Sequence, residues 1–136
     1  MYNRTATTAF LLIAWGTSFA QTPSESKSAA DAWMTKDTIK IHFTRLNGAT
    51  TTFETDVKAG KTNFIGSPDK VCLSSGVPTK ISYVEPKLVI HFEPPIAGCQ
   101  ARQYIFDPVS GDGTIYRPDG SGWVELQPAG KIKLVR

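Results

Sequence analysis

The chain has 136 residues, of which 40% are hydrophobic and 20% are charged, and its formal net charge is +3 at pH 7. This length fits one domain whose core is large enough to fold without a metal. The net charge is too small, and the charged residues too evenly scattered, to favour nucleic acid or an anionic membrane as a partner.

The first twenty residues have the features of a secretory signal peptide. Arg4 precedes an apolar run from Phe10 to Trp15, and small residues around Ser18 and Ala20 close the segment. The apolar run is far shorter than the roughly 20 residues that a transmembrane helix needs. We therefore expect cleavage after Ala20, export to the periplasm or the extracellular space, and no integral membrane segment in the mature protein.

Residues 21–36 are expected to form a flexible leader that ends in a short helix. Small and polar residues fill positions 21–28, a composition typical of disorder. The alanine-rich stretch from Ser28 to Lys36 favours one or two helical turns. Trp33 in this stretch is interpreted as a plug over one end of the domain.

After the leader, the hydrophobic period changes to two, which is typical of half-buried strands. Apolar Ile39 and Ile41 alternate with polar neighbours, and Asn47-Gly48 follows a few residues later. An Asn-Gly pair tolerates the positive φ angles of a tight hairpin turn. The sequence therefore predicts a β-hairpin whose return strand covers residues 50–57.

Further short strands follow at intervals of roughly ten residues, separated by turns rich in Gly, Pro, Asn, Asp and Ser. They are predicted at 62–65, 71–73, 79–84, 87–92, 102–106, 114–117, 123–127 and 131–135. This spacing predicts that residues 37–136 form a single all-β domain, either an antiparallel β-sandwich or a small barrel, with about 8–10 short strands.

The two cysteines are expected to form a disulfide. Cys72 and Cys99 are the only cysteines of the chain, and an even number in an exported protein indicates a bridge. Closing a loop of this size stabilises a protein by roughly 3.5 kcal/mol in the chain-entropy model. A catalytic thiol is disfavoured because the chain has no Cys-x-x-Cys motif and neither cysteine has a histidine nearby in sequence.

The two histidines offer little support for metal binding or nucleophilic catalysis. His42 and His91 both lie within predicted strands, so a zinc site would need the two strands to be neighbours, with Glu93 as a third ligand. A hydrolase would have to use one of these histidines as its base, yet neither lies in a loop. The chain also lacks a Gly-x-Ser-x-Gly motif.

The acidic residues do not indicate a catalytic pair either. Asp107, Asp112 and Asp119 lie in predicted turns, where aspartate serves backbone geometry more often than glycoside hydrolysis. The chain contains no phosphate-binding or dinucleotide-binding motif and no calcium-binding loop. We therefore assign no catalytic residue, no metal ligand and no cofactor.

One surface hypothesis remains, centred on residues 116–123. Tyr116, Arg117, Asp119 and Trp123 flank a glycine-rich turn in this segment. Aromatic and arginine side chains often anchor binding, and loops on a rigid β scaffold frequently carry function. Aromatic residues at strand ends also pack in cores and rims. These four residues are the predicted binding site.

Taken together, the sequence predicts an exported, non-catalytic protein-binding module with a protein partner, such as a periplasmic inhibitor or immunity-type protein. This expectation rests on analogy with the class of small, disulfide-stapled, exported all-β proteins. Two alternatives stay open. One is a carbohydrate-binding module that stacks sugars on Tyr116 and Trp123, and the other is a small secreted hydrolase or an envelope assembly subunit.

Overall fold

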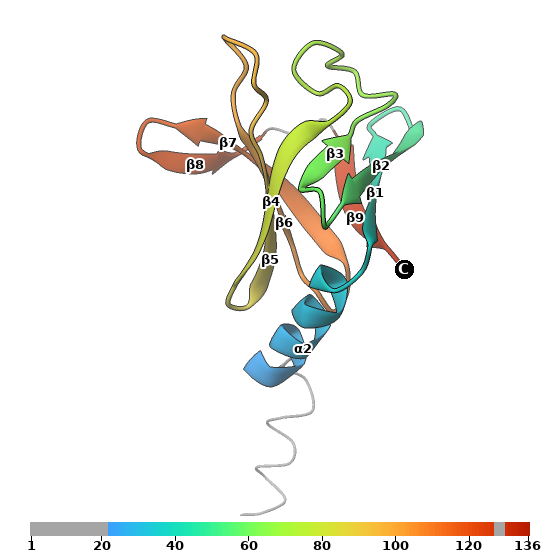
Figure 1. Cartoon of the computed structure of the whole chain (residues 1–136), viewed down its shortest axis with the longest axis vertical. Coiled ribbons are helices and arrows are strands. Elements are labelled where there is room, and N and C mark those ends of the chain that lie inside the picture. Colours follow the sequence, from blue (N-terminus) through green and yellow to red (C-terminus); the bar gives the residue numbers. More distant parts are fainter. Residues whose placement is uncertain (1–21, 127–129) are drawn as a thin grey trace, which may run out of the picture.

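The computed structural model describes residues 22–126 and 130–136, which form one short helix and nine strands (Figure 1). All strand pairings in the described residues are antiparallel. The elements in chain order are α2 (Pro23–Met34), β1 (Thr38–Arg45), β2 (Thr50–Asp56), β3 (Lys61–Asn63), β4 (Val77–Val84), β5 (Lys87–Phe92), β6 (Arg102–Phe106), β7 (Asp112–Asp119), β8 (Gly122–Glu125) and β9 (Gly130–Val135).

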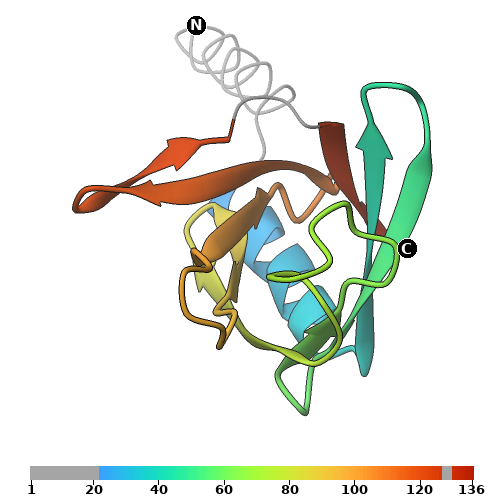
Figure 2. The same cartoon turned by 90° about the horizontal axis from the view of Figure 1, so that it is seen from above.

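Eight of the strands close into an antiparallel barrel. The strand order is β6-β5-β4-β3-β2-β1-β9-β7, and a further pairing between β6 and β7 joins the two ends of the sheet. Within residues 22–126 and 130–136, strand β8 pairs only with β7, and this β7–β8 hairpin projects away from the barrel (Figures 1 and 2). The predicted antiparallel all-β fold is confirmed, and of the two expected architectures the chain adopts the barrel.

An aromatic cluster fills the barrel interior. The ring centroid of Phe64 lies 4.9 Å from those of both Phe53 and Phe92, and Phe92 lies 4.7 Å from Tyr104. All four side chains are buried, and each contributes roughly 1.5–3 kcal/mol through removal of apolar surface from water. The inward positions come from the strand alternation, because successive side chains point to opposite faces of a strand.

Helix α2 closes one end of the barrel, called the helix end below (Figure 2). Ser26, Ala30 and Trp33 form its buried face, with a spacing close to the helical period. The indole Nε1–H of Trp33 donates a hydrogen bond of 2.9 Å to the carbonyl of Pro108. The interpretation of Trp33 as a plug is confirmed, because its side chain belongs to the core cluster.

The helix begins at Pro23, so the prediction of a structureless leader through residue 28 is wrong from Pro23 onward. Thr22 is the N-cap, and its hydroxyl oxygen accepts a hydrogen bond of 3.1 Å from the backbone N–H of Glu25. Proline suits the first helical position because it has no N–H to leave unpaired. A threonine followed by proline and then glutamate is a helix-start pattern, which composition alone does not reveal.

The strand predicted at 71–73 does not form, because these residues lie within the β3–β4 loop, which spans residues 64–76. The side chain of Asp69 accepts a hydrogen bond of 2.9 Å from the backbone N–H of Cys72, and the Asp69 carbonyl accepts one from Leu73. This turn chemistry outweighs the β-propensity of Val71 and Leu73. The other predicted strands coincide with observed strands apart from small shifts at their ends, and residue 127 of the strand predicted at 123–127 lies outside the described residues.

The predicted disulfide is confirmed. Cys72 and Cys99 are bonded, with their Cα atoms 5.5 Å apart. The bond joins the β3–β4 loop to the β5–β6 loop, which spans residues 93–101. It therefore connects two loops that lie far apart in the sequence, at the end of the barrel opposite α2.

Candidate functional site

Three loops gather at the end of the barrel opposite α2 (Figure 1). Because neighbouring strands run in opposite directions, the β1–β2 turn (residues 46–49), the β3–β4 loop and the β5–β6 loop all emerge at this end. The disulfide joins the β3–β4 loop to the β5–β6 loop. Arg45, the last residue of β1, lies directly before the β1–β2 turn, and its guanidinium Nη2 donates a hydrogen bond of 2.6 Å to the Gly66 carbonyl in the β3–β4 loop. These three connected loops are called the loop end below.

Large apolar side chains are exposed on all three loops of the loop end. Leu46 is 77% exposed, Ile65 75%, Val71 66% and Ile96 43%. A single exposed apolar residue is ordinary on a protein surface, whereas several at one place mark an interaction site. The loop end therefore has the composition of a binding surface.

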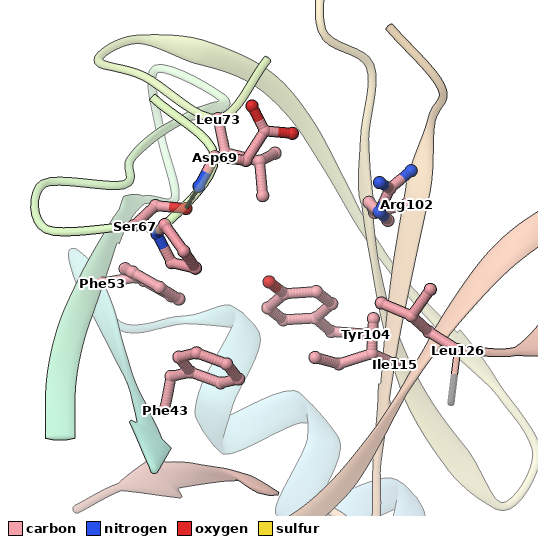
Figure 3. Close-up of a pocket in the computed structure, with 10 residues that line it drawn as sticks. Phe43, Phe53, Ser67, Asp69, Leu73, Arg102, Tyr104, Ile115 and Leu126 are labelled. Carbon is pink, nitrogen blue, oxygen red and sulfur yellow. Dashed lines mark hydrogen bonds between the residues drawn. The ribbon is translucent and has the colours of Figure 1, made fainter. Parts of the chain in front are cut away.

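A pocket of about 120 Å³ opens inside the barrel at the loop end (Figure 3). Phe43, Phe53 and Ile115 form apolar walls, while the charged side chains of Asp69 and Arg102 lie on the side of the loops (Figure 3). An apolar interior with a few polar groups at its opening is the usual composition of a ligand site. We call it the barrel-mouth pocket.

Tyr104 places a hydroxyl inside the barrel-mouth pocket (Figure 3). The residue is only 3% exposed, and burial raises the pKa of Tyr104 well above its usual value, with the positive charge of Arg102 offsetting part of that effect. The phenol is therefore neutral and can both donate and accept a hydrogen bond. It bonds to no other residue within 22–126 and 130–136.

The four predicted binding residues all lie on the β7–β8 hairpin, but on two different faces. Residues directly opposite in an antiparallel ladder share a face. Pro118 pairs with Trp123 and Tyr116 with Glu125, so Tyr116 and Trp123 share one face. Arg117 and Asp119 alternate with them and belong to the other face. The hairpin thus brings the four residues onto one element, with two of them on each face.

Of the two aromatic residues in the predicted site, Trp123 is more exposed than Tyr116. It is 40% exposed, whereas Tyr116 is half-buried. The Trp123 ring packs edge-on against His91, with ring centroids 5.6 Å apart. Part of the indole therefore serves packing on the outer wall of the barrel, and part of it is free to contact a ligand.

His91 and His42 do not meet. His42 lies on β1 and His91 on β5, with β2, β3 and β4 between them in the sheet. Nε2 of His91 lies 2.9 Å from a carboxylate oxygen of Glu93, and its Nδ1 lies 3.3 Å from the side-chain nitrogen of Gln103. The residues that the structure describes contain no group of three or more His, Cys, Asp or Glu side chains that could hold a metal.

The three aspartates considered for catalysis each have a different environment. The carboxylate of Asp107 accepts hydrogen bonds from the backbone N–H groups of Val109 and Ser110, at 2.8 and 3.2 Å. Asp112 lies 3.6 Å from the ammonium of Lys133. Asp119 is exposed at the end of β7. These are the backbone and surface roles expected of aspartate in turns.

None of the predicted binding residues lies in the loop end. Its signal in the sequence is an apolar residue beside turn residues: Leu46 precedes Asn47-Gly48, Ile65 precedes Gly66, and Ile96 follows a pair of prolines. Apolar side chains at turns cannot face the core easily, so they were candidates for exposure. The barrel-mouth pocket has no comparable signal, because it depends on which strands close the barrel.

None of the helices in the described residues is long and apolar enough to cross a membrane. Comparisons of the chain with protein-family models, with curated proteins and with solved structures find no match. The geometry and chemistry of the site are therefore the basis for the proposed function.

Proposed function

We propose that this protein is an exported, non-catalytic protein-binding module that recognises its partner with the loop end. The observation that carries the proposal is the set of four exposed apolar side chains on three connected loops. Leaving apolar surface in water is unfavourable, and covering it stabilises a complex by roughly 25 cal/mol per Å² before the costs of association. A protein surface is the natural cover for such a patch.

The loop end is held in place before any partner arrives. Besides the disulfide and the Arg45 contact, the side chain of Asn63 accepts hydrogen bonds from Ser75 and from the backbone N–H of Gly76, at 3.1 and 2.9 Å. These bonds fix the return of the β3–β4 loop into β4. A surface that is already ordered loses less conformational entropy on binding, so a preorganised loop end supports tight recognition.

The disulfide and the predicted signal peptide support an extracytoplasmic location. Disulfides persist in the periplasm and outside the cell, where thiols are not kept reduced. A small, rigid, disulfide-bonded module in these compartments suits the role of an inhibitor or immunity-type protein that masks a larger target. We include that role in the proposal.

The β7–β8 hairpin supports a second candidate, a carbohydrate-binding surface. Trp123 is exposed on a hairpin that projects from the barrel, and an exposed aromatic ring can stack on a sugar. The half-buried position of Tyr116 leaves a single ring for this purpose. The loop end is therefore the stronger candidate for the binding surface, and the β7–β8 hairpin is the second.

The proposal is tested by affinity capture from an envelope extract of the native host, with the oxidised protein as bait. The double variant Ile65→Ser/Val71→Ser removes apolar surface from the loop end. Val84→Ser is the matched control, because Val84 is 60% exposed at the β4–β5 turn, near the helix end. We expect one stoichiometric partner that is captured by the parent protein and by the control, and at least tenfold less of it by the double variant.

Two results would count against the proposal. Equal capture by the double variant and the parent, combined with loss of capture on Trp123→Ala, would move recognition to the hairpin. An empty capture with a folded bait, together with glycan binding that depends on Trp123, would favour the carbohydrate-binding alternative.

A further inference from the structure

The barrel-mouth pocket contains the hydroxyl of Tyr104, which is directed into a space large enough for one chemical group. Building on the proposed function, we infer that this pocket receives a tyrosine side chain of the partner protein. The phenol of that side chain would pair with the hydroxyl of Tyr104. The β3–β4 loop would contact the inserted ring through Pro68 and Leu73, which line the pocket.

The volume of the pocket is on the scale of a single side chain. Small-molecule and cofactor sites usually measure roughly 300–1,000 Å³, whereas this pocket measures about 120 Å³. A cavity of about 150 Å³ in another protein holds one benzene molecule. The pocket is therefore too small for a cofactor, but it suits one side chain that anchors a larger partner. Such anchors in pockets dominate the energetics of many interfaces.

The walls of the pocket favour an aromatic ring. Phe43 and Phe53 line it with rings whose centroids are 5.9 Å apart, and Ile115 lines it with an aliphatic side chain. Aromatic rings gain from stacked or edge-to-face contacts with one another. Asp69 and Arg102 contribute opposite charges near the opening.

The Tyr104 hydroxyl determines what the ring must carry. A purely apolar occupant would remove water from this hydroxyl and leave it unpaired, which is costly for a buried polar group. A phenol supplies both an O–H donor and an oxygen acceptor, so it can pair with Tyr104 in either direction. Tyrosine combines this group with a ring of the right size, and it is enriched at protein interfaces.

The test uses p-cresol and toluene as probes, because they reproduce the side chains of tyrosine and phenylalanine. Each is titrated into the oxidised protein while the methyl signals of Ile115 and Leu126 are followed by NMR. Tyr104→Phe removes only the pocket hydroxyl. Tyr83→Phe is the matched control, since Tyr83 has a buried hydroxyl without a hydrogen-bond partner in the described residues, and it lies on β4, outside the pocket lining.

We expect p-cresol to bind more tightly than toluene to the parent protein and to the Tyr83 control. In Tyr104→Phe, the ratio of the toluene Kd to the p-cresol Kd should fall about three- to tenfold, the range expected for one hydrogen bond. Excess p-cresol should also release the captured partner from the parent protein.

Absence of p-cresol-induced shifts at the pocket methyls, or an unchanged Kd ratio in Tyr104→Phe, would overturn the inference. Because this titration needs no partner, such a failure leaves the protein-binding proposal standing. If p-cresol binds as expected but does not displace the partner, the site takes free phenols, and the tyrosine anchor is overturned.

Discussion

At the residue scale, a chain of buried threonine hydroxyls crosses the sheet from β2 to β4. The Oγ1 atoms of Thr55 and Thr62 lie 2.7 Å apart, as do those of Thr62 and Thr79, and Thr79 donates to the Val77 carbonyl at 2.8 Å. Since Thr79 uses its proton on that carbonyl, Thr62 donates to Thr79 and Thr55 donates to Thr62. The three hydroxyls are satisfied only as a unit, because each relies on its neighbour.

We predict that Thr62→Val lowers the free energy of unfolding by about 1–3 kcal/mol, because it leaves the buried hydroxyl of Thr55 without an acceptor. Combining it with Thr55→Val and Thr79→Val should cost less than the sum of the three single substitutions, since no hydroxyl is then left unpaired. Urea denaturation monitored by tryptophan fluorescence measures both effects. Thr52→Val, at an exposed position of β2, is the control and should be nearly neutral. Strict additivity would contradict a cooperative chain.

At the element scale, α2 acts as the lid of the barrel, and its start is fixed by local capping. The N-cap bond from Thr22 satisfies one of the backbone N–H groups that the first turn leaves without an intrahelical partner. The side chain of Glu25 lies in this same turn, where a negative charge is favourable at the positive end of the helix dipole. The lid is therefore stabilised both by its own cap and by the burial of Trp33.

We predict that Thr22→Ala lowers the free energy of unfolding by about 0.5–2 kcal/mol, because the alanine cannot accept the hydrogen bond from Glu25. Ser28→Ala is the matched control, since Ser28 is exposed in the middle of the helix and alanine has the higher helix propensity there. The control should be neutral or slightly stabilising. Urea unfolding measures the free energy of unfolding of both variants. Equal values would show that the cap contributes nothing to stability.

At the scale of the whole molecule, the two ends of the barrel differ in kind. The helix end is closed by a packed element, whereas the loop end is held by a covalent bond and a few hydrogen bonds. The disulfide therefore has two effects, one on global stability through the unfolded chain and one on the order of the loops that we propose bind the partner.

We predict that Cys72→Ser/Cys99→Ser lowers the free energy of unfolding by roughly 3.5 kcal/mol, because the unfolded chain regains the entropy of an open loop. The variant should also capture less partner than the parent, since its loops must be ordered on binding. Urea unfolding and the capture assay measure the two effects. Addition of a reductant should reproduce both in the parent and change neither in the variant. Unchanged capture would show that the loops stay ordered without the bond.

Local patterns predicted most of the elements, and they failed where two local signals competed. The ends of β5 and β6 agree with the prediction, because prolines and glycines punctuate the chain on either side. At 71–73, short apolar residues favoured a strand, but the carboxylate of Asp69 accepts a hydrogen bond from the backbone N–H of Cys72 and stabilises a turn instead. At the N-terminal end of α2, polar composition favoured disorder, but the cap of Thr22 started a helix.

The sequence by itself determined the antiparallel β class, the β-hairpin around Asn47-Gly48 and the pairing of the two cysteines, because each depends on local periodicity, turn chemistry or a count of two. The hairpin turn itself differs from the expected one: it spans residues 46–49, and Gly48 has a positive φ whereas Asn47 does not. Only the tertiary structure decided that β9 pairs with both β1 and β7 to close a barrel and that the loop end gathers three separate turns. It also decided that the hydroxyl of Tyr104 opens into a pocket. These features depend on pairings between strands distant in the sequence, and alternation along one strand does not specify its neighbours.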